Sequence, residues 1–78
     1  MQKIRPDLDI GHNIQRLRRA QSLTQDQVVA KMNLQGLPIS KSSYAKIETN
    51  RMNIRISELA ALRCIFLCEY GDFFQGLP

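Results

Sequence analysis

Residues 24–50, TQDQVVAKMNLQGLPISKSSYAKIETN, decide the fold, because they hold the signals for two short helices and the connector between them. Thr24 can accept a backbone N–H at the start of the first helix, and Gln27 completes a capping box three residues later. Gly36 and Pro38 then predict the end of that helix. The stretch therefore predicts a pair of helices joined by a glycine-marked connector.

The second helix of this pair is predicted to begin after Ser40, its candidate N-cap. Its helical spacing turns one set of side chains inward, Ser43, Tyr44 and Ile47, and another outward, Lys41, Ser42, Ala45 and Lys46. Outward lysines and serines suit a helix in a DNA major groove, where they can reach base acceptors or phosphates. A solvated helix face is the alternative explanation of the same pattern.

The size and composition predict one all-α domain over residues 1–78. The chain is 44% hydrophobic and 23% charged, and it has no apolar run long enough to span a bilayer. Residues 1–10 do not resemble a signal peptide, so we expect a soluble, cytoplasmic protein without membrane contact. Cys64 and Cys68 are expected to be small core residues, because a metal site would need ligands beyond the distant His12.

The net charge of +4 is unevenly distributed along the chain. Residues 41–55 carry four basic groups against one acidic group, whereas residues 56–78 carry one basic against three acidic groups. This division suggests a nucleic-acid face and a separate packing or partner face. An ordinary solvated surface explains the charge alone equally well.

The remaining segments predict further helices around the central pair. Residues 1–8 are predicted to form a loose N-terminal arm, followed by a helix from about Asp9 to Ala20. Arg18 lies at the edge of the apolar stripe of that helix and is a candidate for a partly buried ion pair. Asn50 is suited to the left-handed conformation of a helix stop.

The C-terminal third predicts a fourth helix capped by Ser57 and a last turn over YGDFF. Glu69 is the candidate cap of that turn, whose Phe73 and Phe74 are expected to close the core. The fourth helix is apolar around much of its girth. It is therefore either central in the core or half exposed at a subunit interface, where Leu67 is the residue of interest.

Residues 10–74 resemble the Cro and repressor type of helix-turn-helix family, the bacterial and phage regulators called XRE-like. The residues that carry the resemblance are IGHNIQRLRRAQSLTQDQVV, ISKSSYAKIETN and ISELAALRCIFLCEYGDFF, in the family's order of five helices. The resemblance implies a compact lambda-repressor-like bundle that binds double-stranded DNA as a homodimer.

The resemblance also implies roles for individual residues. Gln25 matches a glutamine that binds a DNA phosphate and braces the recognition helix, and Arg51 matches a backbone contact in the following loop. Arg18 and Glu48 match a structural ion pair between the first and third helices. The candidate DNA-binding residues are Gln25, Ser40, Lys41, Ser42, Ser43, Lys46 and Arg51.

Two departures from the family pattern concern the turns beside the recognition helix. The connector from Met32 to Ser40 is about five residues longer than the usual turn, which we explain by a second helix extended to about Gln35. Asn50 stands where the family usually has glycine, a substitution that asparagine tolerates.

The leading hypothesis is a sequence-specific DNA-binding transcriptional regulator, a repressor rather than an enzyme. The alternative is an antitoxin or accessory protein-interaction module that acts through its apolar C-terminal helices. The sequence indicates no catalytic residues, no cofactor site and no small-molecule ligand, since it has no paired carboxylates, activated nucleophile or phosphate-binding glycine loop.

Overall fold

The computed structural model describes residues 3–4 and 9–77 of the 78-residue chain. Its elements, in chain order, are β1 (Lys3–Ile4), α1 (Ile10–Ala20), α2 (Gln25–Leu34), α3 (Lys41–Glu48), β2 (Ile54–Arg55), α4 (Ile56–Phe66) and the 3₁₀ turn η1 (Tyr70–Phe74). The described part of the chain is thus mostly helical, with four α-helices where five helices were expected. The fifth expected helix is the short turn η1.

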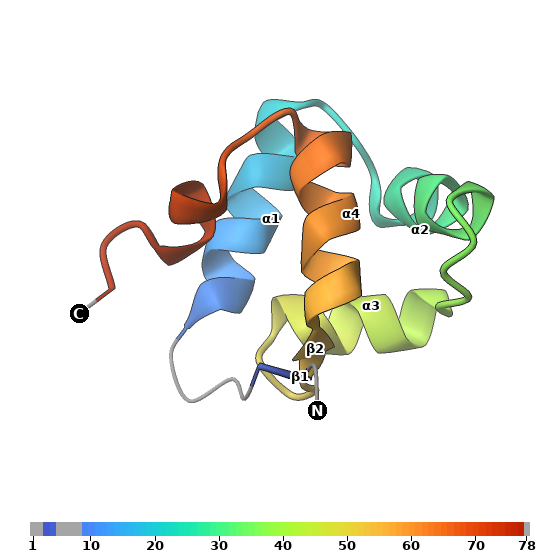
Figure 1. Ribbon diagram of the computed structural model, residues 1–78, viewed down its shortest axis with the longest axis horizontal. Coiled ribbons are helices and arrows are strands. Elements are labelled where there is room, and N and C mark those ends of the chain that lie inside the picture. Colours follow the sequence, from blue (N-terminus) through green and yellow to red (C-terminus); the bar gives the residue numbers. More distant parts are fainter. Residues whose placement is uncertain (1–2, 5–8, 78) are drawn as a thin grey trace.

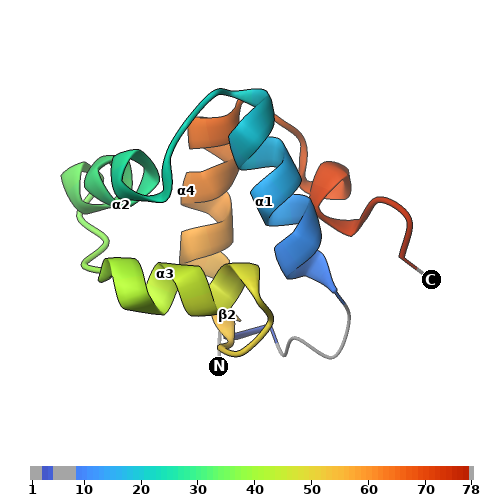
Figure 2. The same cartoon turned by 180° about the vertical axis from the view of Figure 1, so that it is seen from behind.

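The helix α4 stands between α1 and α2 and runs beside α1 (Figure 1). Seen from behind in Figure 2, α3 lies across one end of this pair, next to the N-terminal end of α4. The helix α2 contacts both α3 and α4, while η1 packs against α1. The C-terminal end of α4 lies at the opposite end of the molecule from α3 (Figure 1).

Local side-chain hydrogen bonds start the first three helices, as the sequence predicts. The Asp9 carboxylate accepts the His12 N–H at 3.1 Å, and Thr24 Oγ1 accepts the Gln27 N–H at 3.1 Å. The capping box is complete, because the Thr24 N–H donates to Gln27 Oε1 at 2.8 Å. Ser40 Oγ accepts the Ser43 N–H at 3.0 Å and caps α3.

The prediction that Ser57 caps the fourth helix is wrong. The helix begins at Ile56, with Arg55 in the N-cap position and its N–H donating to Glu58 Oε1 at 2.8 Å. Arg55 is also the last residue of β2, whose extended backbone sets where the helix can begin. Ser57 therefore lies inside the first turn.

All four α-helices end with the same arrangement, a Schellman motif around one residue in the left-handed region. At α4, the Leu67 N–H donates to Cys64 O at 3.3 Å and the Cys68 N–H donates to Arg63 O at 3.1 Å. Equivalent bonds end the other helices. The four left-handed residues are Ser22, Gly36, Asn50 and Leu67, so the predicted stops at Gly36 and Asn50 are confirmed.

The core is continuous and draws on every helix. Its largest fully buried side chains are Ile14, Val28, Met32, Tyr44, Ile54, Leu62, Phe66 and Phe73. Two sequence expectations about the core are wrong. Phe74 is 39% exposed, because the short turn η1 directs only Phe73 inward. Cys64 is exposed on α4 and only Cys68 packs partly against the core; both thiols are free.

A two-residue antiparallel pair joins the start of the chain to the α3–α4 connection. Lys3 is opposite Arg55 and Ile4 is opposite Ile54. The sequence predicts a loose arm over residues 1–8, whereas Lys3–Ile4 form a strand; residues 1–2 and 5–8 lie outside the described residues. Ile54 is buried, so β2 lies against the core.

Candidate functional site

A buried ion pair holds α3 to α1 on the core-facing side of α3. Arg18 of α1 donates to the Glu48 carboxylate through Nε at 2.7 Å and through Nη2 at 3.2 Å. Both side chains are almost fully buried. A bidentate contact of this kind sets the relative orientation of the two helices, because both groups must face each other in one plane.

Two further hydrogen bonds complete this network. Gln25, the first residue of α2, donates to Glu48 Oε1 at 3.0 Å, and Arg18 Nη1 donates to the Leu23 carbonyl at 2.8 Å. Burial raises the pKa of the Glu48 carboxyl, but the hydrogen bonds from Arg18 and Gln25 outweigh burial and leave that pKa below its usual range. The network therefore connects α1, α2 and α3 through one ionised carboxylate.

Burial also affects Tyr44, which lies one helical turn before Glu48. Its side chain is fully buried, and burial together with the neighbouring Glu48 charge raises the pKa of the phenol. The hydroxyl therefore stays neutral in the folded protein. The prediction that Tyr44 and Ile47 are core residues is confirmed.

The C-terminal end of α3 lies directly against the first turn of α1. A Cβ atom on Gly11 would be 2.5 Å from the Glu48 carbonyl oxygen and 2.7 Å from that of Ile47, so the contact requires glycine. Asn50 closes the same junction. Its Oδ1 accepts the Gly11 N–H at 3.1 Å and its Nδ2 donates to the Asp9 carboxylate.

The opposite side of α3 is open to solvent. We call the three exposed residues Lys41, Ser42 and Lys46 the α3 outer face. Lys41 Nζ is 3.3 Å from the Asp26 carboxylate of α2, but both side chains are more than half exposed. Such a surface pair is weak, so Lys41 can leave Asp26 for a stronger anion.

The other candidate DNA-binding residues surround this face. Ser40 and Ser43 are hydrogen-bonded to each other, with their Oγ atoms 3.1 Å apart, in the cap of α3. Arg51 is exposed after the helix, and its Nε donates to Thr49 Oγ1 at 3.0 Å. The structure thus groups all seven candidates on or next to α3, with Gln25 reaching it from the start of α2.

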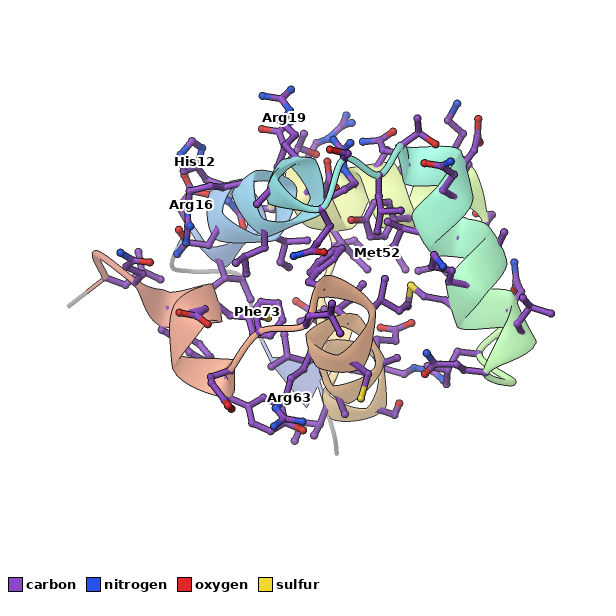
Figure 3. All side chains as sticks on the ribbon, turned by 90° about the horizontal axis from the view of Figure 1, so that it is seen from above. His12, Arg16, Arg19, Met52, Arg63 and Phe73 are labelled. Carbon is purple, nitrogen blue, oxygen red and sulfur yellow. The ribbon has the colours of Figure 1, made fainter. Side chains whose placement is uncertain are left out.

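The basic residues of α1 differ in what they contact. Figure 3 shows His12 and Arg19 pointing outward from α1, away from α4, and Arg63 pointing outward on the opposite side of the molecule. Arg16 Nη2 donates to Gln75 Oε1 at 3.1 Å, which holds it to the C-terminal segment. Arg16 therefore has partners within the chain and is less free to contact another molecule.

The long connector between α2 and α3 is anchored at several points. The helix α2 ends at Leu34, and Gly36 follows it with a φ of 84°. Asn33 Oδ1 accepts the Ile39 N–H at 3.2 Å, while Leu37 and Ile39 pack partly against the core. The expectation of an extended second helix with Gly36 as its stop is confirmed.

Sequence reasoning missed several residues that contact the candidate DNA-binding residues or the end of α3. Asp26 makes a weak surface contact with Lys41, and Thr49 accepts a hydrogen bond from Arg51. The close contact at Gly11 could have been predicted, because a glycine in the first turn of an otherwise regular helix indicates that another backbone segment lies close to it. Asn50 was recognised as a helix stop, but its bonds to α1 depend on the tertiary structure.

The described residues contain no helix long and apolar enough to cross a membrane. Among the same residues, no group of three or more His, Cys, Asp or Glu side chains could hold a metal ion. Comparisons with models of known protein families, with curated proteins and with solved structures give no match.

Proposed function

We propose that this chain is a sequence-specific double-stranded DNA-binding regulator of the helix-turn-helix type, acting as a homodimeric repressor without enzymatic activity. One observation carries the proposal. The α3 outer face presents two lysines and a serine to solvent, while the opposite side of the helix is fixed by Arg18, Glu48 and Gln25. A rigidly held helix with such a face suits base reading in a major groove.

The start of α3 supports phosphate contact at the edge of the same groove. The backbone N–H groups of Lys41 and Ser42 lie in the first turn, where a helix has no internal acceptors for them. Such N–H groups bind phosphate oxygens, and the helix dipole favours the negative charge. Gln25 and Arg51 lie near the other end of α3, where Gln25 donates to Glu48 and Arg51 follows the helix, and they offer further donors there.

The base-reading side chains are Ser42 and Lys46 in this proposal, with Lys41 within reach of a base or a phosphate. Lys46 lies one turn after Ser42 on the exposed side of α3. Lysine can donate to guanine O6 or N7, and serine can donate to or accept from several bases. Changing Lys46 should thus alter the preferred sequence, whereas changing Arg51 should weaken binding to all sequences alike.

The test is selection from random duplex DNA at about physiological salt, followed by sequencing of the retained fraction. The wild type is expected to enrich one two-fold symmetric site, and the double variant K41A/K46A is expected to weaken or change that enrichment. R16Q is the charge control, since Arg16 is held by Gln75 of the C-terminal segment and is neither a candidate DNA-binding residue nor part of the α3 outer face. Retention of DNA without any enriched sequence would refute the proposal.

The second candidate function is that of a protein-interaction module, such as an antitoxin. It is favoured by two almost fully exposed leucines, Leu34 at 87% and Leu67 at 79%. Salt dependence separates the two candidates, because phosphate contacts release counterions and make DNA affinity fall steeply with salt. Binding of a protein through these leucines would change little with salt.

A further inference from the structure

Leu67 adopts a backbone conformation that leucine disfavours. Its φ is 54° and its ψ is 48°, in the left-handed region at the stop of α4. For a residue with a Cβ atom this conformation crowds the following carbonyl oxygen, which is why glycine is usual at this position. The Leu67 side chain is also 79% exposed, so burial in the chain itself does not compensate. Such an outlier is a reason to look for a function.

Leu67 lies beside an apolar cleft and is itself exposed at its edge. A cleft of about 560 Å³ lies between the C-terminal ends of α2 and α4, with Leu23 and Ile65 among its apolar lining. Leu34 and Leu67 border the cleft, and both are the most exposed large apolar residues among those described. The same surface therefore offers two apolar side chains and an apolar space that could receive one.

The charges on either side of Leu67 have opposite signs. Lys31 lines the cleft on the α2 side and is exposed. Two carboxylates, Glu69 and Asp72, line a second hollow together with Arg63, and Leu67 also borders it. The Glu69 carboxylate is 78% exposed although it is 3.2 Å from Arg63 Nη2. When a two-fold axis passes between the cation and the carboxylates, such a surface brings opposite charges of the two copies together.

We propose that Leu34, Leu67 and the cleft between them, here called the dimer surface, bind a second copy of this chain across a two-fold axis. In a two-fold dimer the same patch meets itself, so a leucine of each copy can enter the cleft of the other. Lys31 of each copy then faces the carboxylates beside Leu67 of its partner. This inference rests on the homodimer of the proposed function, to which it assigns a contact surface.

The position of the dimer surface is compatible with DNA binding by both copies. The C-terminal end of α4 lies at the opposite end of the molecule from α3 (Figure 1). A copy bound at Leu67 therefore leaves the α3 outer face of its partner open. The contact would also cover Cys64 and Ile65 of α4, which line the cleft.

Sedimentation velocity without DNA, over concentrations from low micromolar upward, tests the inference. The wild type is expected to form a dimer, and Leu67→Gly is expected to weaken the dimer by about tenfold or more. Glycine keeps the left-handed stop of α4, so this variant removes the side chain without disturbing the helix end. Ile56→Ala is the matched control, since Ile56 is 51% exposed at the other end of α4.

A charge exchange tests the two-fold arrangement. K31E and E69K should each weaken self-association, because each places like charges against each other twice in the dimer. An equimolar mixture of the two variants should restore a dimer, since both contacts then join opposite charges. A wild type that stays monomeric at all concentrations, or an L67G variant that dimerises like the wild type, would overturn the inference.

Binding to a DNA duplex with a single half-site separates this inference from the proposed function. The L67G monomer should bind a half-site as well as a wild-type monomer does, while its affinity for the full symmetric site falls. A Leu67-dependent dimer that retains no DNA supports the dimer surface and counts against the regulator. Sequence-specific DNA binding by a protein whose dimer does not depend on Leu67 supports the regulator and overturns the dimer surface.

Discussion

Removing one partner of the buried Arg18–Glu48 pair should cost more stability than removing both. In Glu48→Gln the guanidinium stays buried but loses its counter-charge, although its bond to the Leu23 carbonyl remains. In the double variant R18M/E48L both charges are replaced by apolar side chains of similar length. Comparison of the two variants therefore separates the cost of an uncompensated buried charge from the net value of the pair.

The expected loss of unfolding free energy in each variant follows from the burial and the hydrogen bonds of the removed groups. Breaking a buried pair by removing one partner costs about 3–5 kcal/mol, and the retained Leu23 contact places Glu48→Gln near 3 kcal/mol. The double variant leaves the Leu23 carbonyl without its donor, which costs about 1 kcal/mol. Gln25 loses its acceptor too, but it is only half-buried and can bind water. A chain of this length has about 4–12 kcal/mol of stability, so both variants should still fold.

Urea denaturation followed by circular dichroism measures the difference. With a slope of about 1 kcal/mol per molar urea, Glu48→Gln should lower the midpoint by about 3 M and the double variant by about 1 M. A Glu48→Gln midpoint within a few tenths of the wild type would refute the reasoning. A double variant that is less stable than Glu48→Gln would also refute it. The attraction between Arg18 and Glu48 would then exceed the cost of removing both charges from water.

Four further predictions concern stability. Gly11→Ala should cost about 1–3 kcal/mol in urea unfolding, because its Cβ would meet backbone atoms of α3 that cannot move aside. Asn50→Ala should cost about 1–2 kcal/mol and Asn50→Gly less, since glycine loses the two side-chain bonds but keeps the left-handed conformation. Leu67→Gly should raise the stability of the monomer by about 1 kcal/mol in dilute thermal unfolding. The pKa values of Asp9 and Glu48 are lowered in the folded state, so the stability that they contribute is present above about pH 5 and is lost as pH falls below about 4; unfolding free energies that stay constant from pH 6 to pH 3 would contradict this.

The helix starts could be predicted from the sequence because the interactions that make them are local. Thr24 with Gln27 and Ser40 with the Ser43 N–H each join positions three residues apart. Ser57 failed as a predicted cap for the opposite reason. The backbone of Arg55 is held in a strand by pairing with Lys3, which lies at the far end of the chain and leaves no local signal.

The residues that hold α3 in place were only partly predictable. Arg18 lies at the edge of an apolar stripe, which suggested a buried charge, and the family resemblance suggested Glu48 as its partner. Two interactions join residues far apart in sequence: the contact of Gly11 with the end of α3, and the hydrogen bond that the Gly11 N–H donates to Asn50. Only the packed helices bring these groups together, so a single sequence gives their types but not their pairing.

The residues in left-handed conformation at the helix ends differ in how the cost of that conformation is offset, and this difference helps to distinguish a structural from a functional role. Glycine meets this requirement without cost at Gly36, and Asn50 offsets it through bonds to Gly11 and Asp9. Leu67 has the same backbone conformation, yet its side chain lies in solvent. If its strain is only tolerated, Leu67→Gly will stabilise the chain and change nothing else. If the leucine is needed for a contact between copies, the same substitution will raise monomer stability and lower self-association, two effects of opposite sign that a purely structural role cannot produce.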